Sequence, residues 1–193
     1  PLNLLLVLFP QKLIVEGVTV ILLIKVGLAG SFMAIYLRNT NKGGGIAVVG
    51  FSTLYALCSY VMAYYWCIMW IDAVALLPLC ILGLNRLIDE GKTVMYTVTL
   101  ALIVFINYYM AIMVCIFILF YYPVLYFIKV KNGGARRCLM TLGNAVGHSL
   151  LGVVMAGVML LPTYISMQST YYISSEIPED TVFYNDPLDI LNQ

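Results

Sequence analysis

Charged residues are scarce in this chain. Aspartate, glutamate, lysine and arginine make up only 10% of its 193 residues, whereas 63% of the residues are hydrophobic. Soluble domains average about 25% charged and about 45–50% apolar residues, so this composition excludes an ordinary soluble domain. The net charge of +1 gives no indication of nucleic-acid binding. A mean hydropathy of +0.98 instead indicates an integral membrane protein.

Motifs for metal or nucleotide binding are also missing. The five cysteines lie singly in or beside apolar segments, without the spacing of a zinc site or a disulfide framework, and are expected to be small buried hydrophobic residues. The glycine runs at 41–45 and 132–134 follow no predicted strand, so we interpret them as cytoplasmic turns rather than phosphate-binding loops. No signal peptide is recognised, and the chain is expected to be the early part of a longer polypeptide.

Long hydrophobic runs are abundant. A helix needs about 20 apolar residues to cross a membrane, and runs of this quality occupy residues 13–37, 46–66, 71–87, 94–128 and 139–161. As one helix the fourth run would extend roughly 50 Å, well beyond a hydrocarbon core of about 30 Å, so it is expected to turn back. The turn is predicted at Asn107, Tyr108 and Tyr109, because an amide side chain can satisfy freed backbone groups and tyrosines suit the interface.

Basic residues predict which side each loop faces, because Lys and Arg are retained in short cytoplasmic loops. If the fourth run makes two crossings, 94–106 and 110–128, all three basic segments fall on the same side. The prediction is therefore an all-α polytopic domain of six crossings over residues 1–165, followed by the start of an extracytoplasmic segment at 166–193. The cytoplasmic loops are then 38–45, 85–93 and 129–138, and the outer segments are 66–72, 107–109 and 164–193.

Ionisable residues within apolar runs are costly and are treated first as functional candidates. Asp72 either stabilises a helix start or faces an outer cavity as a base, a metal ligand or a hydroxyl-orienting group. Lys25 is predicted about 18 Å below the outer end of its span, pointing toward another helix, a water-filled cavity or a lipid phosphate. Glu16 falls on the opposite helix face and is not its partner. His148, among small residues, is expected to bond to a neighbouring helix rather than relay protons.

Several motifs carry a family resemblance. The run YALCSYVMAYYWCIMWIDAVALLPLCILGLNRLIDEGK, followed by INYYMAIMVCIF and LLPT, resembles the bacterial YfhO membrane-protein family. The opening PLNLLLVLFP and the lysine of ILLIKVGLAG are similar to that family's segment after its first outer loop. The resemblance covers nearly the whole chain, as the early part of a longer family member in the bacterial cell membrane.

The resemblance implies a function. The family is similar to the GT-C class of membrane glycosyltransferases, which move a sugar from a polyprenyl-phosphate carrier to an acceptor on the outer face. For this family the acceptor is a cell-envelope polymer such as lipoteichoic acid. By this resemblance Asp72 is the candidate catalytic group, with or without a divalent metal, and the substrate-binding candidates are Lys25, Trp70, Asn107, Tyr108 and Tyr109. The principal base is expected in a loop before Pro1, so this part alone is expected to be inactive.

Two other classes remain open. In a transporter or lipid flippase, Lys25 and His148 would be coupling or substrate groups near the midplane. In a noncatalytic membrane scaffold, the aromatic residues would only anchor the helices. Loss of sugar transfer on Asp72→Asn, with normal membrane insertion, would separate the enzyme from both alternatives.

Overall fold

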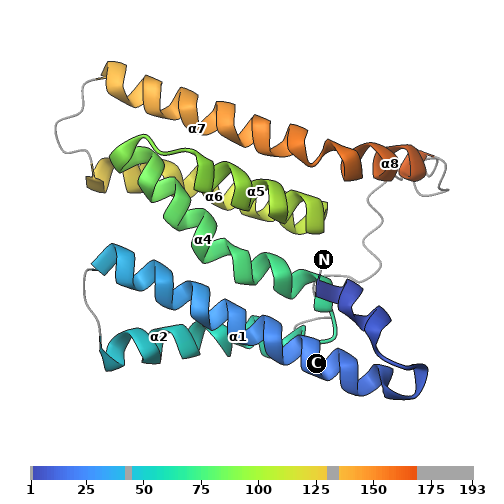
Figure 1. Ribbon diagram of the computed structural model, residues 1–193. Coiled ribbons are helices and arrows are strands. Elements are labelled where there is room, and N and C mark those ends of the chain that lie inside the picture. Colours follow the sequence, from blue (N-terminus) through green and yellow to red (C-terminus); the bar gives the residue numbers. More distant parts are fainter. Residues whose placement is uncertain (1, 42–44, 130–134, 169–193) are drawn as a thin grey trace, which may run out of the picture. The chain divides into compact units, whose positions relative to one another are not determined.

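The computed structural model describes residues 2–41, 45–129 and 135–168, and every regular element in these ranges is helical (Figure 1). The all-α prediction is thereby confirmed. The residues after 168, which form most of the predicted outer segment, lie outside the described ranges. In order, the elements are η1 (Leu2–Leu8), η2 (Gln11–Leu13), α1 (Ile14–Asn41), α2 (Ile46–Ala56), α3 (Ser59–Ala63), α4 (Ile68–Glu90), α5 (Val94–Ile106), α6 (Tyr108–Lys129), α7 (Ala135–Met155) and α8 (Gly157–Gln168).

The chain divides into two compact units, residues 1–158 and 159–193. The elements from η1 to α7 all belong to the first unit, and α8 belongs almost entirely to the second. Among the described residues, four helices are long and apolar enough to cross a membrane, or five if the bent pair α7 and α8 forms one span. Helix α5 has only 13 residues, roughly 20 Å of helix. The count of six crossings therefore stays a prediction.

Helix α4 is central to the first unit. It packs against α1, α5, α6 and α7. In its most apolar 18-residue stretch 56% of the residues are buried, compared with 17% in the corresponding stretch of Gln11–Thr40. At Gly83 its backbone approaches α5 so closely that a Cβ atom would lie 2.6 Å from the backbone nitrogen of Tyr96. A left-handed cap at Gly91, with φ of 70°, then ends α4 and reverses the chain into α5.

Helices α1 and α4 run parallel, with α2 and α3 returning between them in the chain (Figure 1). Within the described ranges, two hydrogen bonds between side chains join them. Lys25 Nζ donates to Asp72 Oδ2 at 3.0 Å, and Arg86 Nη2 donates to Asn39 Oδ1 at 3.1 Å. Each bond joins residues 47 positions apart. The register between α1 and α4 is therefore constant over roughly 20 Å of helix.

The chain breaks between α5 and α6 at Asn107, the position where the sequence predicts a turn. This residue is extended, with φ of −157° and ψ of 106°, and separates α5 from α6. Its Oδ1 accepts the backbone N–H groups of Tyr109 at 3.0 Å and Met110 at 3.2 Å. The side chain thus satisfies donors that the first turn of α6 would otherwise leave unpaired. Helix α6 runs back beside α5 from this point (Figure 1).

Two predicted spans are divided in the structure. The span 46–66 is interrupted at Leu57 and Cys58, between α2 and α3. The span 139–161 is interrupted at Ala156, whose N–H donates to the carbonyl oxygens of both Gly152 and Val153. Hydropathy is uniform across both breaks, so the apolar pattern alone predicts continuous helices there.

Candidate functional site

A buried ion pair joins Lys25 on α1 to Asp72 on α4. Lys25 is 0% exposed and Asp72 is 5% exposed. Lys25 Nζ donates to Asp72 Oδ2 at 3.0 Å, to the Ile68 carbonyl oxygen at 2.8 Å and to Asn3 Oδ1 at 2.7 Å. A protonated lysine has three N–H donors, so all of them are used. The structure thus brings together two residues that the sequence singled out separately.

The ion pair relates the positions of Lys25 and Asp72 along their helices. The sequence places Lys25 about 18 Å below the outer end of its span and Asp72 at the outer mouth of another. In the structure the two side chains meet, and their depth in a membrane stays a prediction. The ion pair joins the twelfth residue of α1 to the fifth residue of α4, so the first residues of α1 extend roughly 10 Å beyond the start of α4.

The position of Asp72 in α4 does not fit a residue that stabilises the start of the helix. Asp72 is the fifth residue of α4, and no acidic residue lies in the first turn of that helix. Because the stabilisation of an anion by the helix dipole falls off within the first turn, the dipole does not account for this carboxylate. The ion pair with Lys25 accounts for it instead. Asp72 is held by a cation from another helix.

A cavity of about 190 Å³ adjoins the ion pair. Lys25 and Asp72 are its only charged lining residues, and the other lining side chains are apolar and come from η1, α1, α4 and α5. The removal of two charges from water costs several kcal/mol per ion, which the attraction between them repays only in good geometry. Because burial of these two charges costs free energy, we treat the pair and the apolar cavity beside it as a candidate functional site.

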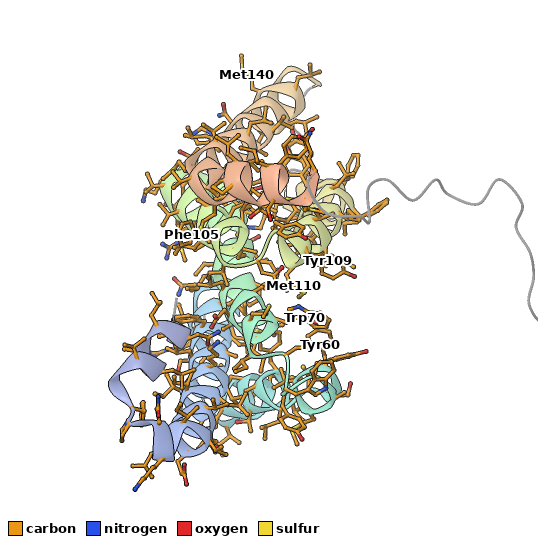
Figure 2. The ribbon with its side chains drawn as sticks, turned by 90° about the vertical axis from the view of Figure 1, so that its right-hand side faces the viewer. Tyr60, Trp70, Phe105, Tyr109, Met110 and Met140 are labelled. Atoms are coloured by element: carbon orange, nitrogen blue, oxygen red, sulfur yellow. The ribbon has the colours of Figure 1, made fainter. Side chains whose placement is uncertain are left out.

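Aromatic side chains gather at the same end of α4. We call Tyr60, Tyr64, Trp66, Trp70 and Tyr109 the aromatic cluster. The Trp70 ring lies 6.2 Å from that of Tyr109 and 5.6 Å from that of Tyr64. The Tyr60 hydroxyl lies 3.6 Å from the Met110 sulfur. Figure 2 shows Tyr60, Trp70, Tyr109 and Met110 close to one another. The start of α6 is therefore held beside the start of α4.

This grouping places the predicted substrate-binding residues relative to Asp72. Trp70 lies two residues before Asp72 on α4, and Asn107 positions Tyr109 against Trp70 through the cap of α6. Ile106, the residue before Asn107, lines the cavity. Tyr108 is 41% exposed and takes part in none of the ring contacts found in the described part of the chain. Four of the five residues thus belong to one end of the first unit through observed contacts.

The other two candidates lie apart from this site. Glu16 is exposed in the first turn of α1 and is not bonded to Lys25, as expected. His148 Nδ1 lies 2.8 Å from the carbonyl oxygen of Asn144 in its own helix. The expected hydrogen bond to a neighbouring helix is not found in the described chain. The next residue, Ser149, makes that interhelical contact instead, with its Oγ 2.6 Å from the Tyr96 hydroxyl.

A metal site would need more ligands than Asp72 offers. Among residues 2–41, 45–129 and 135–168, no group of three or more His, Cys, Asp or Glu side chains is placed to hold a metal ion. The single carboxylate beside the cavity is already bonded to a lysine. The described residues therefore do not form a coordination set for a metal ion.

Sequence reasoning missed Asn3 and the pairing of Lys25 with Asp72. Asn3 lies in η1, ahead of the first apolar run, where a lone polar residue gives no signal. The pairing could have been predicted from the sequence. Charged residues within apolar runs are rare and costly, so a lysine and an aspartate in two such runs are expected to pair with each other.

Comparison with known proteins adds one match. The whole chain, residues 1–193, matches the family described as bacterial membrane protein YfhO. No curated protein and no solved structure matches it.

Proposed function

The chain belongs to the YfhO family of bacterial membrane proteins, and from that premise we propose that it is part of a membrane glycosyltransferase. In this proposal a sugar passes from a polyprenyl-phosphate carrier to a cell-envelope polymer such as lipoteichoic acid, on the outer face of the bacterial cell membrane. The observation that carries the proposal is the Lys25–Asp72 pair, buried at the wall of an apolar cavity at the same end of α4 as the aromatic cluster.

The reaction has three requirements. An acceptor hydroxyl attacks the anomeric carbon, the bond from that carbon to the carrier phosphate breaks, and the hydroxyl proton goes to a base. A carboxylate within hydrogen-bond reach of the hydroxyl can take the proton or orient the hydroxyl. We assign this role to Asp72, the carboxylate that lines the cavity.

Lys25 is assigned a positioning role. Its three donors are engaged by Asp72, Asn3 and the Ile68 carbonyl, so it fixes the carboxylate relative to α1 and η1. Contact with the carrier phosphate would require one of these bonds to be given up. Asn3 is the partner to exchange, because it is neutral and comes from a short element. Lys25 would then stabilise the departing phosphate while it still holds Asp72.

The surroundings suit the two halves of the donor. The apolar lining of the cavity favours a short segment of an isoprenoid chain. The faces of Trp70 and Tyr109 are suited to stacking on a sugar ring, and Tyr109 is 49% exposed. Arg86, Lys92 and Lys129 line a pocket at the other end of α4. Because basic residues are retained in the cytoplasm, their position favours an outward-facing Asp72 end.

The test is Asp72→Asn in the full-length protein, assayed in membranes with a panel of polyprenyl-phosphate-linked sugars. We expect sugar transfer to fall by about 100-fold or more, because general acid–base groups contribute about 10²–10⁴ in rate. The matched control is Asp89→Asn, which changes a carboxylate on the same helix that is also paired with a lysine. This variant is expected to retain transfer.

Membrane insertion is measured in parallel by protease protection. Unchanged transfer by a normally inserted Asp72→Asn protein would remove Asp72 from the mechanism. A wild-type protein that moves the carrier lipid across the bilayer but transfers no sugar would support the flippase alternative.

A further inference from the structure

A second pocket lies at the other end of α4. It has a volume of about 460 Å³ and is formed where α1, α4 and α6 end, with Asn39, Asn85, Arg86, Asp89 and Lys129 among its lining residues. Asn85 follows Asp72 by 13 residues on α4, roughly 20 Å along the helix. The pocket is therefore separate from the cavity beside Lys25, and it plays no part in the proposed sugar transfer.

An unpaired acceptor lines this pocket. Asn85 is 4% exposed, and its side-chain carbonyl oxygen is buried without a hydrogen-bond partner. More than about 90% of buried polar groups have a partner, so an exception calls for an explanation such as a missing ligand. The group that would satisfy Asn85 is a hydrogen-bond donor, such as a hydroxyl.

The charges in the pocket are unevenly paired. Lys129 pairs with Asp89, and Lys92 pairs with Glu90 at 2.7 Å. Arg86 has no carboxylate within ion-pair distance in the described chain. Its guanidinium donates to two neutral acceptors, Asn39 Oδ1 at 3.1 Å and Met95 Sδ at 3.5 Å. Because a guanidinium has five N–H donors, three remain for an anion.

We propose that this pocket binds a phosphate ester that carries a free hydroxyl group. The phosphate accepts hydrogen bonds from Arg86, whose planar fork suits phosphate oxygens. The hydroxyl donates to Asn85 Oδ1. A cation alone would find both nearby carboxylates already paired, and a fully ionised phosphate alone would leave Asn85 without a donor. The volume lies within the range of about 300–1,000 Å³ that is usual for small-molecule sites.

This chemistry has two sources, the headgroup of an anionic phospholipid and a soluble phosphate ester. The first probe is phosphatidylglycerol, whose headgroup carries hydroxyls, compared with phosphatidylmethanol, an anionic diester without them. Binding to the detergent-solubilised full-length protein is measured by native mass spectrometry. The second probe is glycerol 3-phosphate, measured by titration calorimetry. Binding of phosphatidylglycerol alone identifies the lipid source, and comparable binding of glycerol 3-phosphate identifies the soluble source.

Two variants test the two contacts. Arg86→Gln is expected to weaken binding of the hydroxyl-bearing probe about tenfold, as expected for loss of a charge-assisted hydrogen bond. Asn85→Leu is expected to abolish the preference for phosphatidylglycerol over phosphatidylmethanol while both still bind. That substitution removes no hydrogen bond at the carbonyl, so the fold should persist. Should Arg86→Gln fail to fold, Arg86→Lys keeps the charge but loses the fork, and a several-fold weakening is expected.

The control is Lys92→Gln. Lys92 lies on the same pocket, but its side chain is 74% exposed, so it reports general surface charge. It is expected to change binding less than twofold. Three results would overturn the proposal: no saturable binding of either probe, equal weakening by Lys92→Gln and Arg86→Gln, or a hydroxyl preference that survives Asn85→Leu.

Discussion

Helix α4 carries two aspartates that are each paired with a lysine from another helix, in opposite surroundings. At Asp72 the two side chains are 6% and 0% exposed, whereas at Asp89 the carboxylate is 49% exposed and its partner Lys129 is 22% exposed. The chemical groups are the same. The access of water to them differs.

That difference decides what each pair can contribute. Water screens the Asp89 pair, and exposed pairs are worth about 0–1 kcal/mol. The Asp72 pair has lost its hydration and depends on a full set of protein partners, which Asn3 and the Ile68 carbonyl complete for Lys25. A buried pair is weak evidence for stabilisation of the fold. The position of the pair at the wall of a cavity is better explained by a role in the proposed sugar transfer.

The largest effect is expected when the buried pair is broken from one side. Lys25→Met leaves the Asp72 carboxylate buried without its cation, and we expect a loss of about 3–5 kcal/mol in the free energy of unfolding. Denaturation in detergent micelles measures it. Lys129→Met, the equivalent change at the exposed pair, is the control and should cost at most about 1 kcal/mol. Equal losses in the two variants would remove the distinction between the pairs.

The double variant Lys25→Met with Asp72→Leu separates stability from function. Replacement of both charges by apolar groups is often neutral or stabilising, by about 1–4 kcal/mol. We therefore expect the double variant to regain most of the lost stability and still transfer no sugar. Restored transfer would show that the pair is only structural.

A smaller effect is expected at Asn107, which supports the aromatic cluster at the Asp72 end of α4. Asn107→Ala removes the acceptor of two N–H groups in the first turn of α6. Loss of such a cap costs about 0.5–2 kcal/mol, and the tryptophan fluorescence that reports the Trp70–Tyr109 contact should change. The control is Asn144→Ala, an exposed position inside α7, which should leave both signals in place.

The smallest effect is expected at the exposed pair itself. Asp89→Asn should lower the unfolding free energy by less than about 1 kcal/mol, and the difference from wild type should shrink as salt is raised. The measurement is denaturation at low and high ionic strength. A salt-independent loss of several kcal/mol would mean that this pair is shielded like the one at Asp72.

The sequence predicts features that depend on local chemistry and length. The break at Asn107 follows from a run too long for one crossing and a side chain able to cap the helix that follows. The interruption at Ala156 has no comparable signal, because the residues on both sides of it remain apolar. Helix content is therefore predictable here, while the exact extent of two spans is not.

The site is predicted only in part, because it depends on the register between distant helices. Lys25 and Asp72 are recognisable separately as costly charges. Their contact requires α1 and α4 to be aligned across an intervening span, and hydropathy does not specify how far one helix slides along another. Asn3 is harder still, since nothing before the fold forms distinguishes it from a polar residue in solvent.

The equal spacing of the two links between α1 and α4 has a mechanical consequence. A slide of either helix by one turn would sever both links together, so we expect the two helices to move as a single rod. Opening of the cavity beside Lys25 would then require movement of η1 or of the last turns of α5, which supply the rest of its lining.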